Sequence, residues 1–127
     1  MAEIVGNCLC GAVRFRLTGP RRVHYCHCTM CQKSTGAPAA VLAWVVRQSL
    51  LWTGEAKPLE YRSSPIAVRS FCGKCGSAIA LAYDAGDEIG IHTAALDQRA
   101  ELAPAPQYHY GAESQLPHNG RKLVGRQ

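Results

Sequence analysis

Seven cysteines are the residues of this sequence whose type and spacing point to chemistry. Cys8 and Cys10 form a C-x-C pair near the start, and Cys72 and Cys75 form a C-x-x-C pair much later in the chain. A structural zinc ion takes four ligands in a closed tetrahedron and binds thiolates well. We therefore predict that these four cysteines hold one structural zinc, which staples two distant segments together.

A glycine follows the second cysteine of each pair, at Gly11 and Gly76. Its small size lets the turn tighten so that backbone N–H groups approach the sulfurs, which lowers the cost of gathering negative thiolates. The alternative is that these cysteines are free thiols packed as small hydrophobic side chains. The flanking glycines and the short spacing favour metal binding.

The remaining cysteines, Cys26, Cys28 and Cys31, form a C-x-C-x-x-C cluster with no fourth cysteine available. A zinc ion with three protein ligands keeps one position open for water or substrate, so we predict a catalytic zinc here. Three thiolates make the ion a poor activator of water but a good partner for an incoming thiol, whose thiolate would attack an electrophilic carbon. Carbon–sulfur chemistry is expected, and this second zinc is the one prone to loss or oxidation during handling.

Histidines complicate only the second cluster. His27 lies between two of its cysteines and could close the site as a fourth ligand. We favour an outer role, because a side chain between two ligating neighbours should point away from a metal that they share. The others lack ligand spacing, so we expect surface or packing roles for His24, His92, His109 and His118.

Composition excludes several classes of protein. An odd number of cysteines cannot pair completely into disulfides, and the N-terminus shows neither a basic cluster nor a long apolar stretch, so we expect a cytoplasmic protein. The longest apolar run, 39–46, is far shorter than the ~20 residues that span a bilayer. We expect no membrane partner.

Charge gives little support to nucleic-acid binding. The formal net charge is +5, but the basic residues are scattered, and only Arg21-Arg22 and Arg121-Lys122 are adjacent. Arg21, Arg22 and Lys33 could hold the carboxylates of a substrate thiol, although exposed solubilising charges are the favoured interpretation. We expect no nucleic-acid partner.

Hydrophobic patterning predicts the elements that position the cysteines. Residues 12–18 alternate strictly between apolar and polar, as in a half-buried strand, and 39–46 is a valine-rich buried strand. We expect 21–38 to be an irregular loop with one helical turn over 29–34. The fold class is therefore mainly β, a small antiparallel zinc-stapled domain with little helix. Further strands are expected at 59–62, 66–71, 78–83 and 88–93.

The order of the cysteine motifs, C-x-C, then C-H-C-x-x-C, then C-G-K-C-G, resembles the glutathione-dependent formaldehyde-activating enzymes and their relatives, including the centromere protein V domain. The resemblance covers about residues 4–97 and includes Gly11, Val13, the segment 32–36 and Gly76. It implies a tent-like β fold with the two zinc sites assigned above. It also implies a carbon–sulfur lyase, in which glutathione adds to formaldehyde to give S-hydroxymethylglutathione.

The end of the chain departs from the family pattern. Residues 106–110 look familiar, but 116–118 lacks the tryptophan expected after Pro117. We expect one domain over 1–127, with an irregular segment from 98 onward. The cysteine framework predicts zinc and the reaction class better than it predicts the particular thiol or aldehyde. The alternative hypothesis is a non-enzymatic module with two structural zinc ions, used for protein or nucleic-acid contacts.

Overall fold

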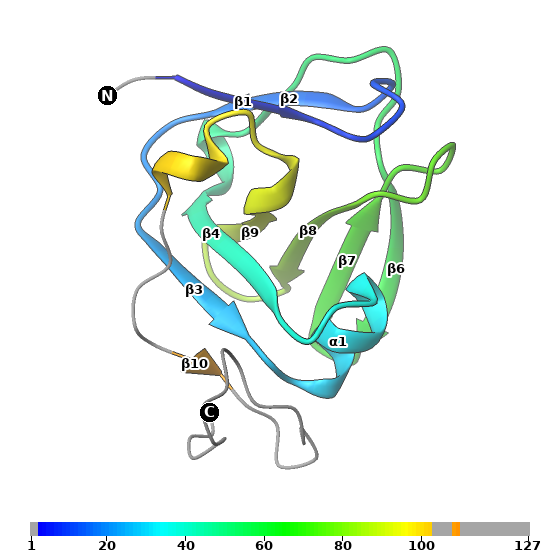
Figure 1. Ribbon diagram of the computed structural model, residues 1–127, viewed down its shortest axis with the longest axis vertical. Coiled ribbons are helices and arrows are strands. Elements are labelled where there is room, and N and C mark those ends of the chain that lie inside the picture. Colours follow the sequence, from blue (N-terminus) through cyan, green and yellow to red (C-terminus); the bar gives the residue numbers. More distant parts are fainter. Residues whose placement is uncertain (1–2, 103–107, 110–127) are drawn as a thin grey trace.

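The computed structural model describes residues 3–102 and 108–109 (Figure 1). Its strands are β1 (Ile4–Asn7), β2 (Arg14–Leu17), β3 (Arg22–Cys26), β4 (Ala40–Val46), β5 (Leu51–Trp52), β6 (Leu59–Ser64), β7 (Ala67–Phe71), β8 (Ala78–Tyr83), β9 (Glu88–His92) and β10 (Tyr108–His109). The helical elements are α1 (Thr29–Thr35) and three 3₁₀ turns, η1 (Arg47–Ser49), η2 (Thr93–Ala95) and η3 (Arg99–Glu101).

The strands form two sheets. A three-stranded sheet has the order β1-β2-β5, and a seven-stranded sheet has the order β10-β3-β4-β9-β8-β7-β6. Neighbouring strands are antiparallel except β10, which pairs with β3 in parallel. The predicted mainly β, antiparallel fold with little helix is confirmed.

Most predicted strands are present with small shifts at their ends. β2 shows the expected alternation, because Phe15 and Leu17 are buried while Arg14 and Arg16 are exposed. The segment 21–38 differs from the prediction. Its first part is the strand β3 rather than a loop, because this segment pairs with β4 along its whole length.

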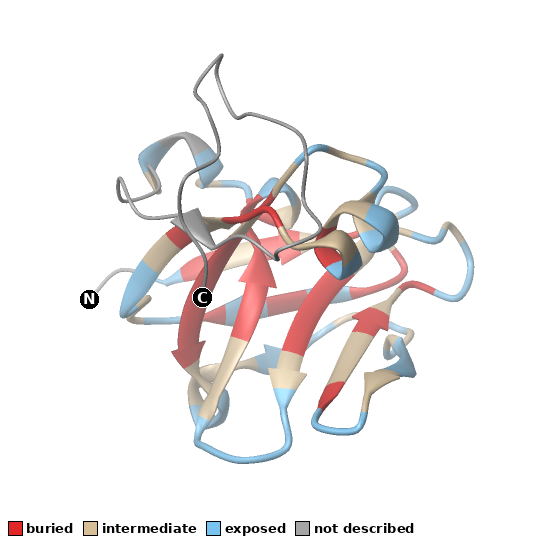
Figure 2. Cartoon of the chain, turned by 90° about the horizontal axis from the view of Figure 1, so that it is seen from below, coloured by how far each residue is buried: buried red, intermediate tan, exposed pale blue. Residues whose placement is uncertain are grey.

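The large sheet is packed on both faces, and buried residues run along its strands in Figure 2. In β4, Leu42 and Trp44 belong to one buried cluster and Val45 to the other, as the alternation of a strand requires. This explains why β4 reads as a continuous apolar run. The cluster towards the small sheet includes Phe15, Leu17, Val45, Ile79, Ile91, Cys8 and Cys72. The opposite cluster includes Leu42, Trp44, Ala67, Leu81, Cys26 and Cys31.

The two cysteine groups therefore belong to different buried clusters. None of the helices in the described part of the chain is long and apolar enough to cross a membrane. The expectation of an irregular segment from 98 onward lies largely outside the described residues, as do the departures noted at 116–118. Within the described part, that segment contains η3 and β10.

Two candidate metal centres

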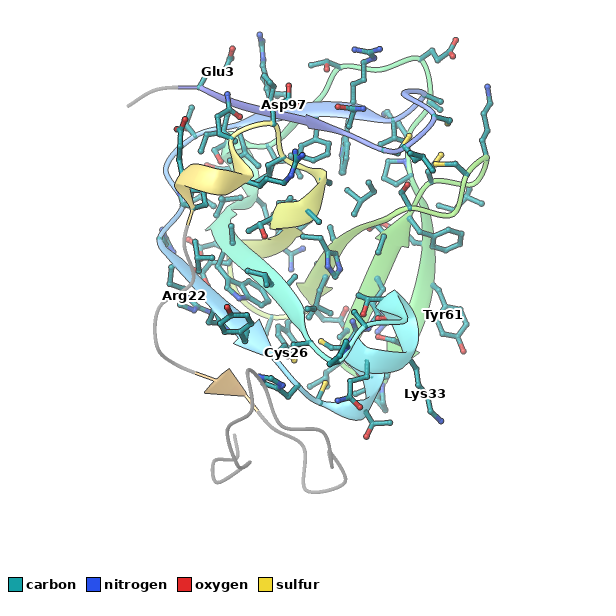
Figure 3. All side chains as sticks on the ribbon, in the orientation of Figure 1. Glu3, Arg22, Cys26, Lys33, Tyr61 and Asp97 are labelled. Carbon is teal, nitrogen blue, oxygen red and sulfur yellow. The ribbon has the colours of Figure 1, made fainter. Side chains whose placement is uncertain are left out.

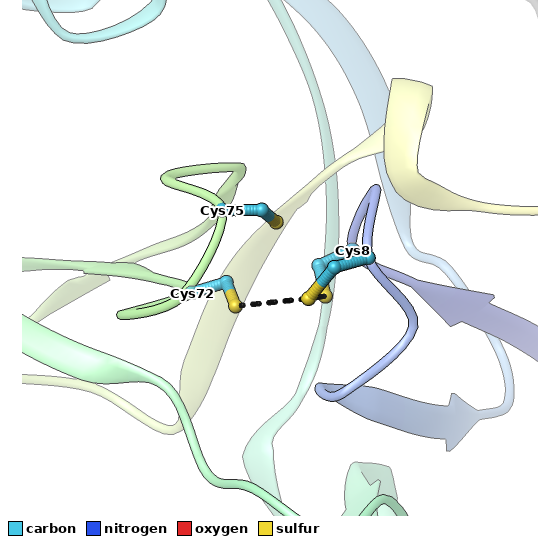
Figure 4. Close-up of side chains that lie close together, drawn as sticks. Cys8, Cys72 and Cys75 are labelled. Atoms are coloured by element: carbon cyan, nitrogen blue, oxygen red, sulfur yellow. Dashed lines mark hydrogen bonds between the residues drawn. The ribbon is translucent and has the colours of Figure 1, made fainter.

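The first candidate centre joins the turn between β1 and β2 to the turn between β7 and β8 (Figure 4). The sulfur atoms of Cys8, Cys10, Cys72 and Cys75 all lie within 4.8 Å of one another. Sγ of Cys10 is 3.6 Å from Sγ of Cys8 and 3.8 Å from Sγ of Cys72. A zinc tetrahedron with Zn–S bonds of about 2.3 Å has sulfurs about 3.8 Å apart. The donor set and its spacing fit a zinc ion.

Backbone N–H groups point at these sulfurs, as the glycine pattern predicts. The Val13 N–H donates to Sγ of Cys8, and the Lys74 N–H donates to Sγ of Cys72, both at 3.3 Å. Gly11 and Gly76 both adopt positive φ, at 83° and 79°, which other residues rarely do. These turns aim amide dipoles at the thiolates, and so lower the cost of bringing negative charges together.

Ser77 links the two turns and was missed by sequence reasoning. Its Oγ accepts a hydrogen bond from the Leu9 N–H at 3.0 Å and lies 3.2 Å from Sγ of Cys75. The Ser77 hydroxyl can thus donate a hydrogen bond to Sγ of Cys75, and this hydrogen bond lowers the pKa of Cys75 to about 5. Ser77 follows Gly76 directly, but its contact with Leu9 depends on the pairing of distant turns.

The second candidate centre lies where β3 ends and α1 begins. Cys26 is the last residue of β3, Cys28 is the N-cap of α1, and Cys31 lies in the first turn of the helix. Figure 3 marks Cys26 beside α1. The Cys31 N–H donates to Sγ of Cys28 at 3.4 Å, as an N-cap requires. The cap and the helical turn therefore bring the second and third sulfurs together.

The three sulfurs are crowded. Sγ of Cys26 lies 3.5 Å from Sγ of Cys28 and 2.8 Å from Sγ of Cys31, the latter shorter than the edge of a zinc tetrahedron. Hydrogen bonds from Cys26 and Cys31 lower the pKa of Cys28 to about 2, and the contacts with Cys28 and Cys31, together with burial, raise the pKa of Cys26. Without a cation, ionisation is therefore favoured at Cys28 and disfavoured at Cys26 and Cys31. A divalent cation is the group that would allow all three to ionise.

His27 does not join this group. Its ring is fully buried, and its nitrogens are not among the ligand atoms that lie within 4.8 Å of one another. The geometry thus favours the predicted outer role over a fourth ligand from this side chain. His24 and His92 are also buried, which fits packing roles. The side chain of His109 and all of His118 lie outside the described residues.

Arg69 of β7 is the most informative residue that sequence reasoning missed. Its Nη1 and Nη2 lie 3.7 and 3.8 Å from Sγ of Cys31, and Nη1 also donates to Oγ of Ser34 at 3.1 Å. Its Nε is buried and has no hydrogen-bond partner among the described residues. A guanidinium in this position offsets the excess negative charge of a three-thiolate centre. The signal available in the sequence was a basic residue inside a strand that leads directly to Cys72.

A cavity of about 320 Å³ opens onto the second cluster. It lies on the face of the large sheet opposite the small sheet, and both Cys28 and Arg69 line it. Its other lining residues are Arg22, His24, Cys26, Met30, Cys31, Leu42, Trp44, Ser63, Ser64, Ile66, Ala67, Leu81 and Tyr83. The second cluster is therefore exposed to a hollow large enough for a small molecule, at the lower end of the usual range for ligand sites.

A second hollow, of about 730 Å³, separates α1 from the first cluster. Ser34 and Thr35 of α1, His92, Asp97 and Arg99 are among its lining residues. Burial, with a smaller effect from Arg69, lowers the pKa of His92 to about 4, so this imidazole is neutral at pH 7. The hollow is thus lined by apolar side chains and neutral hydrogen-bonding groups, together with Cys8, Asp97 and Arg99.

The basic residues near the second cluster make surface contacts. Arg21 pairs with Asp87 and Glu88, and Arg22 pairs with Glu88 at 2.9 Å. All are partly or fully exposed, in line with solubilising charges, although Arg22 also lines the rim of the 320 Å³ cavity. Exposed pairs of this kind contribute little to stability.

Comparisons with known proteins identify a family and several similar chains. Residues 3–112 match the family model of the glutathione-dependent formaldehyde-activating enzyme. An uncharacterized lyase of Schizosaccharomyces pombe is 30% identical over 87 residues, which cover 68% of this chain and 62% of the relative. A Halomonas elongata protein, provisionally named a glutathione-dependent formaldehyde-activating enzyme, is 32% identical over 83 residues, which cover 58% of this chain and 52% of the relative.

The chain therefore spans between about half and three fifths of the length of these curated relatives. A crystal structure of a Rhodobacter sphaeroides protein superposes with a TM-score of 0.65 at 23% identity. The match covers 84% of this chain and 99% of that one, which shows that the two share a fold.

Proposed function

The chain belongs to the glutathione-dependent formaldehyde-activating enzyme family, and on that premise we propose that it is a zinc-dependent carbon–sulfur lyase. It adds a thiol, glutathione or a similar molecule, to a small aldehyde. Cys8, Cys10, Cys72 and Cys75 would hold a structural zinc ion. Cys26, Cys28 and Cys31 would hold the catalytic one.

The difference between the two cysteine groups supports this proposal. The first group offers four sulfurs with tetrahedral spacing, which is a complete set of ligands. The second offers three sulfurs at the wall of a cavity. Three protein ligands beside a cavity is the arrangement of a reactive site, and four ligands that join two turns is the arrangement of a structural one.

The reaction needs a thiolate and an aldehyde carbon held together. A zinc ion in the second cluster would supply a position where an incoming thiol is bound as its thiolate at neutral pH. The Arg69 guanidinium stabilises the thiolate of Cys31 and reduces the negative potential that would repel the incoming thiolate. The thiolate sulfur donates its electron pair to the carbonyl carbon, the C=O π electrons move to the oxygen, and that oxygen takes up one proton. The reverse breakdown gives the lyase reaction.

Zinc and thiol stoichiometry test the proposal. Native mass spectrometry of the reduced protein is expected to show two zinc ions per chain and one bound glutathione. Exchange NMR is expected to show faster exchange between free and formaldehyde-bound glutathione when the protein is added. Two zinc ions with no thiol adduct, and an exchange rate that the protein does not increase, would instead support a non-enzymatic zinc module.

Arg69 gives a further prediction. Changing Arg69 to Met keeps an apolar stem of similar length but removes the cation beside Cys31. We expect the affinity for the second zinc to fall about tenfold, because residues that contact ligands usually contribute 10–100-fold. Affinity is measured by competition with a chromophoric zinc chelator.

The matched control is Arg62→Met, which removes an exposed arginine of β6 that pairs with Asp84 at 2.9 Å and, among the described residues, has no hydrogen bond to a cysteine. It should leave both zinc affinities unchanged. Equal affinities in Arg69→Met and the parent protein would show that the guanidinium does not support the second centre.

A further inference from the structure

The cavity over the second cluster is much larger than formaldehyde needs. Engineered cavities of ~150 Å³ accept a benzene ring, whereas this one measures about 320 Å³. A one-carbon aldehyde would leave most of that volume unfilled. The cavity therefore has room for a substituent of about six to ten carbon atoms beside the reacting carbon.

Its walls are mainly apolar and aromatic. Leu42, Trp44 and Leu81 are buried in the sheet below it, whereas Met30, Ile66 and Tyr83 are 47%, 60% and 43% exposed at its rim. Large apolar side chains exposed together around a hollow are typical of a binding site. The charged ends of a glutathione body would lose hydration against these apolar side chains, whereas Arg22 and Arg69 line other parts of the same cavity. The apolar part of the cavity therefore suits the substituent of the aldehyde rather than the thiol.

Trp44 forms a fixed wall of this cavity. Its indole Nε1–H donates to Nε2 of His24 at 2.6 Å, and the two ring planes lie within 9°. Because Nε2 of His24 accepts, its Nδ1 carries the proton and donates to the Tyr25 carbonyl at 3.0 Å. This chain of hydrogen bonds holds the indole in one orientation.

A glycine makes room for this wall. Gly90 of β9 lies opposite Trp44 in the register of the sheet, and a Cβ at this position would lie 3.0 Å from two atoms of the indole. With no side chain there, the indole lies across β9, and its ring centre is 5.9 Å from that of Tyr83, with the planes 14° apart. The two rings present a rigid aromatic surface beside the three sulfurs.

From this geometry we infer that the preferred electrophile is an aldehyde with an apolar substituent of aromatic size, which packs against Trp44 and Tyr83. The inference rests on the proposed thiol addition. The bonds are those of that reaction: the thiol S–H bond and the carbonyl π bond break, a C–S bond and an O–H bond form, and the proton lost by the thiol is balanced by the one that the oxygen gains.

The test compares two aldehydes in the zinc-loaded protein with glutathione. For each aldehyde, the rate acceleration is the catalysed rate divided by the uncatalysed rate. We expect a phenylacetaldehyde acceleration at least ~10-fold above that of formaldehyde, since even one methylene in an apolar pocket can contribute about 10-fold or more.

Variants at the rim test the same preference. Ile66→Asp places a charge at the exposed rim and should lower the ratio of the phenylacetaldehyde acceleration to the formaldehyde acceleration about tenfold. The control, Leu51→Asp, changes an exposed leucine of β5 outside the cavity and should leave the ratio unchanged.

Binding is measured separately with 2-phenylethanol, which has the same apolar group but cannot react. Trp44 is one of two tryptophans, so its indole N–H signal is assigned by comparison with Trp52→Phe. We expect 2-phenylethanol to shift the Trp44 signal in the parent protein and to shift it less in Ile66→Asp. An unchanged Trp44 signal, or a formaldehyde acceleration equal to or above that of phenylacetaldehyde, overturns the inference. If neither aldehyde reacts, the proposed function is wrong and the aldehyde assignment fails with it, whether or not 2-phenylethanol binds.

Discussion

Changing Cys72 to Ser is expected to remove most of the stability of the folded protein. The Cys72 side chain is 1% exposed and is part of the buried cluster that also contains Cys8, Phe15 and Ile79. Structural zinc contributes about 10–16 kcal/mol in small zinc domains, which is comparable to the whole stability of a typical protein, about 5–15 kcal/mol. Loss of one of four ligands should therefore unfold the protein near room temperature. A melting curve recorded by circular dichroism measures this effect.

The control is the same substitution in the other cluster. Cys28→Ser removes one thiolate from the second centre but leaves the first intact, so its melting temperature should stay near that of the parent. A strong zinc chelator should destabilise the parent as much as Cys72→Ser does. A Cys72→Ser melting temperature within about 5 °C of the parent, a shift equivalent to about 1 kcal/mol, would show that this cluster does not staple the fold.

The grouping of the cysteines could be predicted because spacing along the chain carries it. A C-x-C pair or a C-x-x-C pair brings its own sulfurs together in one turn, whatever the rest of the fold does. Because a closed zinc site needs four ligands, the pair at Cys8 and Cys10 is then assigned to the same site as the pair at Cys72 and Cys75. The strands were predictable for a similar reason, because β2 and β4 show their burial in consecutive residues.

The strand β3 could not be predicted in the same way. Arg22, His24 and Cys26 alternate on one face of this strand, and this face lines the cavity with polar and sulfur-containing side chains rather than with large apolar ones. A sequence pattern of polar residues at alternate positions resembles a loop when both faces lack large aliphatic side chains. Only the pairing with β4 reveals the strand, and that pairing depends on residues far away in the chain.

Arg69 and Ser77 were missed because their partners are distant in sequence. Arg69 reaches Cys31 from another strand, and Ser77 reaches Leu9 from another turn. Neither contact leaves a local motif, so a single sequence contains no spacing that would predict it. By contrast, the outer role expected for His27 uses only its position between two cysteines, which is local geometry. Its ring nitrogens are not among the grouped ligand atoms, and the role itself stays a prediction.

Changing Cys28 to Ser should abolish the reaction and leave the fold intact. We expect the second zinc to be lost and the thiol addition to slow by more than about 100-fold, beyond the 10–100-fold typical of residues that only support ligands. Stability should change little, because serine is among the preferred N-cap residues and its Oγ can accept from the Cys31 N–H as the sulfur does. Zinc is counted by native mass spectrometry, and the reaction is followed by exchange NMR.

Cys28→Ala separates the two tasks of this side chain. Alanine removes the ligand and the cap together, so this variant should lose the same zinc but be about 1 kcal/mol less stable than Cys28→Ser. The difference in melting temperature between the two variants measures how much the N-cap hydrogen bond contributes to stability. The loss of turnover that they share measures how much the zinc ligand contributes to the reaction. If Cys28→Ser kept both the second zinc and the reaction, the three-cysteine cluster would not be the reaction centre. If it unfolded as fully as Cys72→Ser, the two clusters would share one structural task, because a site used only for chemistry does not hold the sheets together.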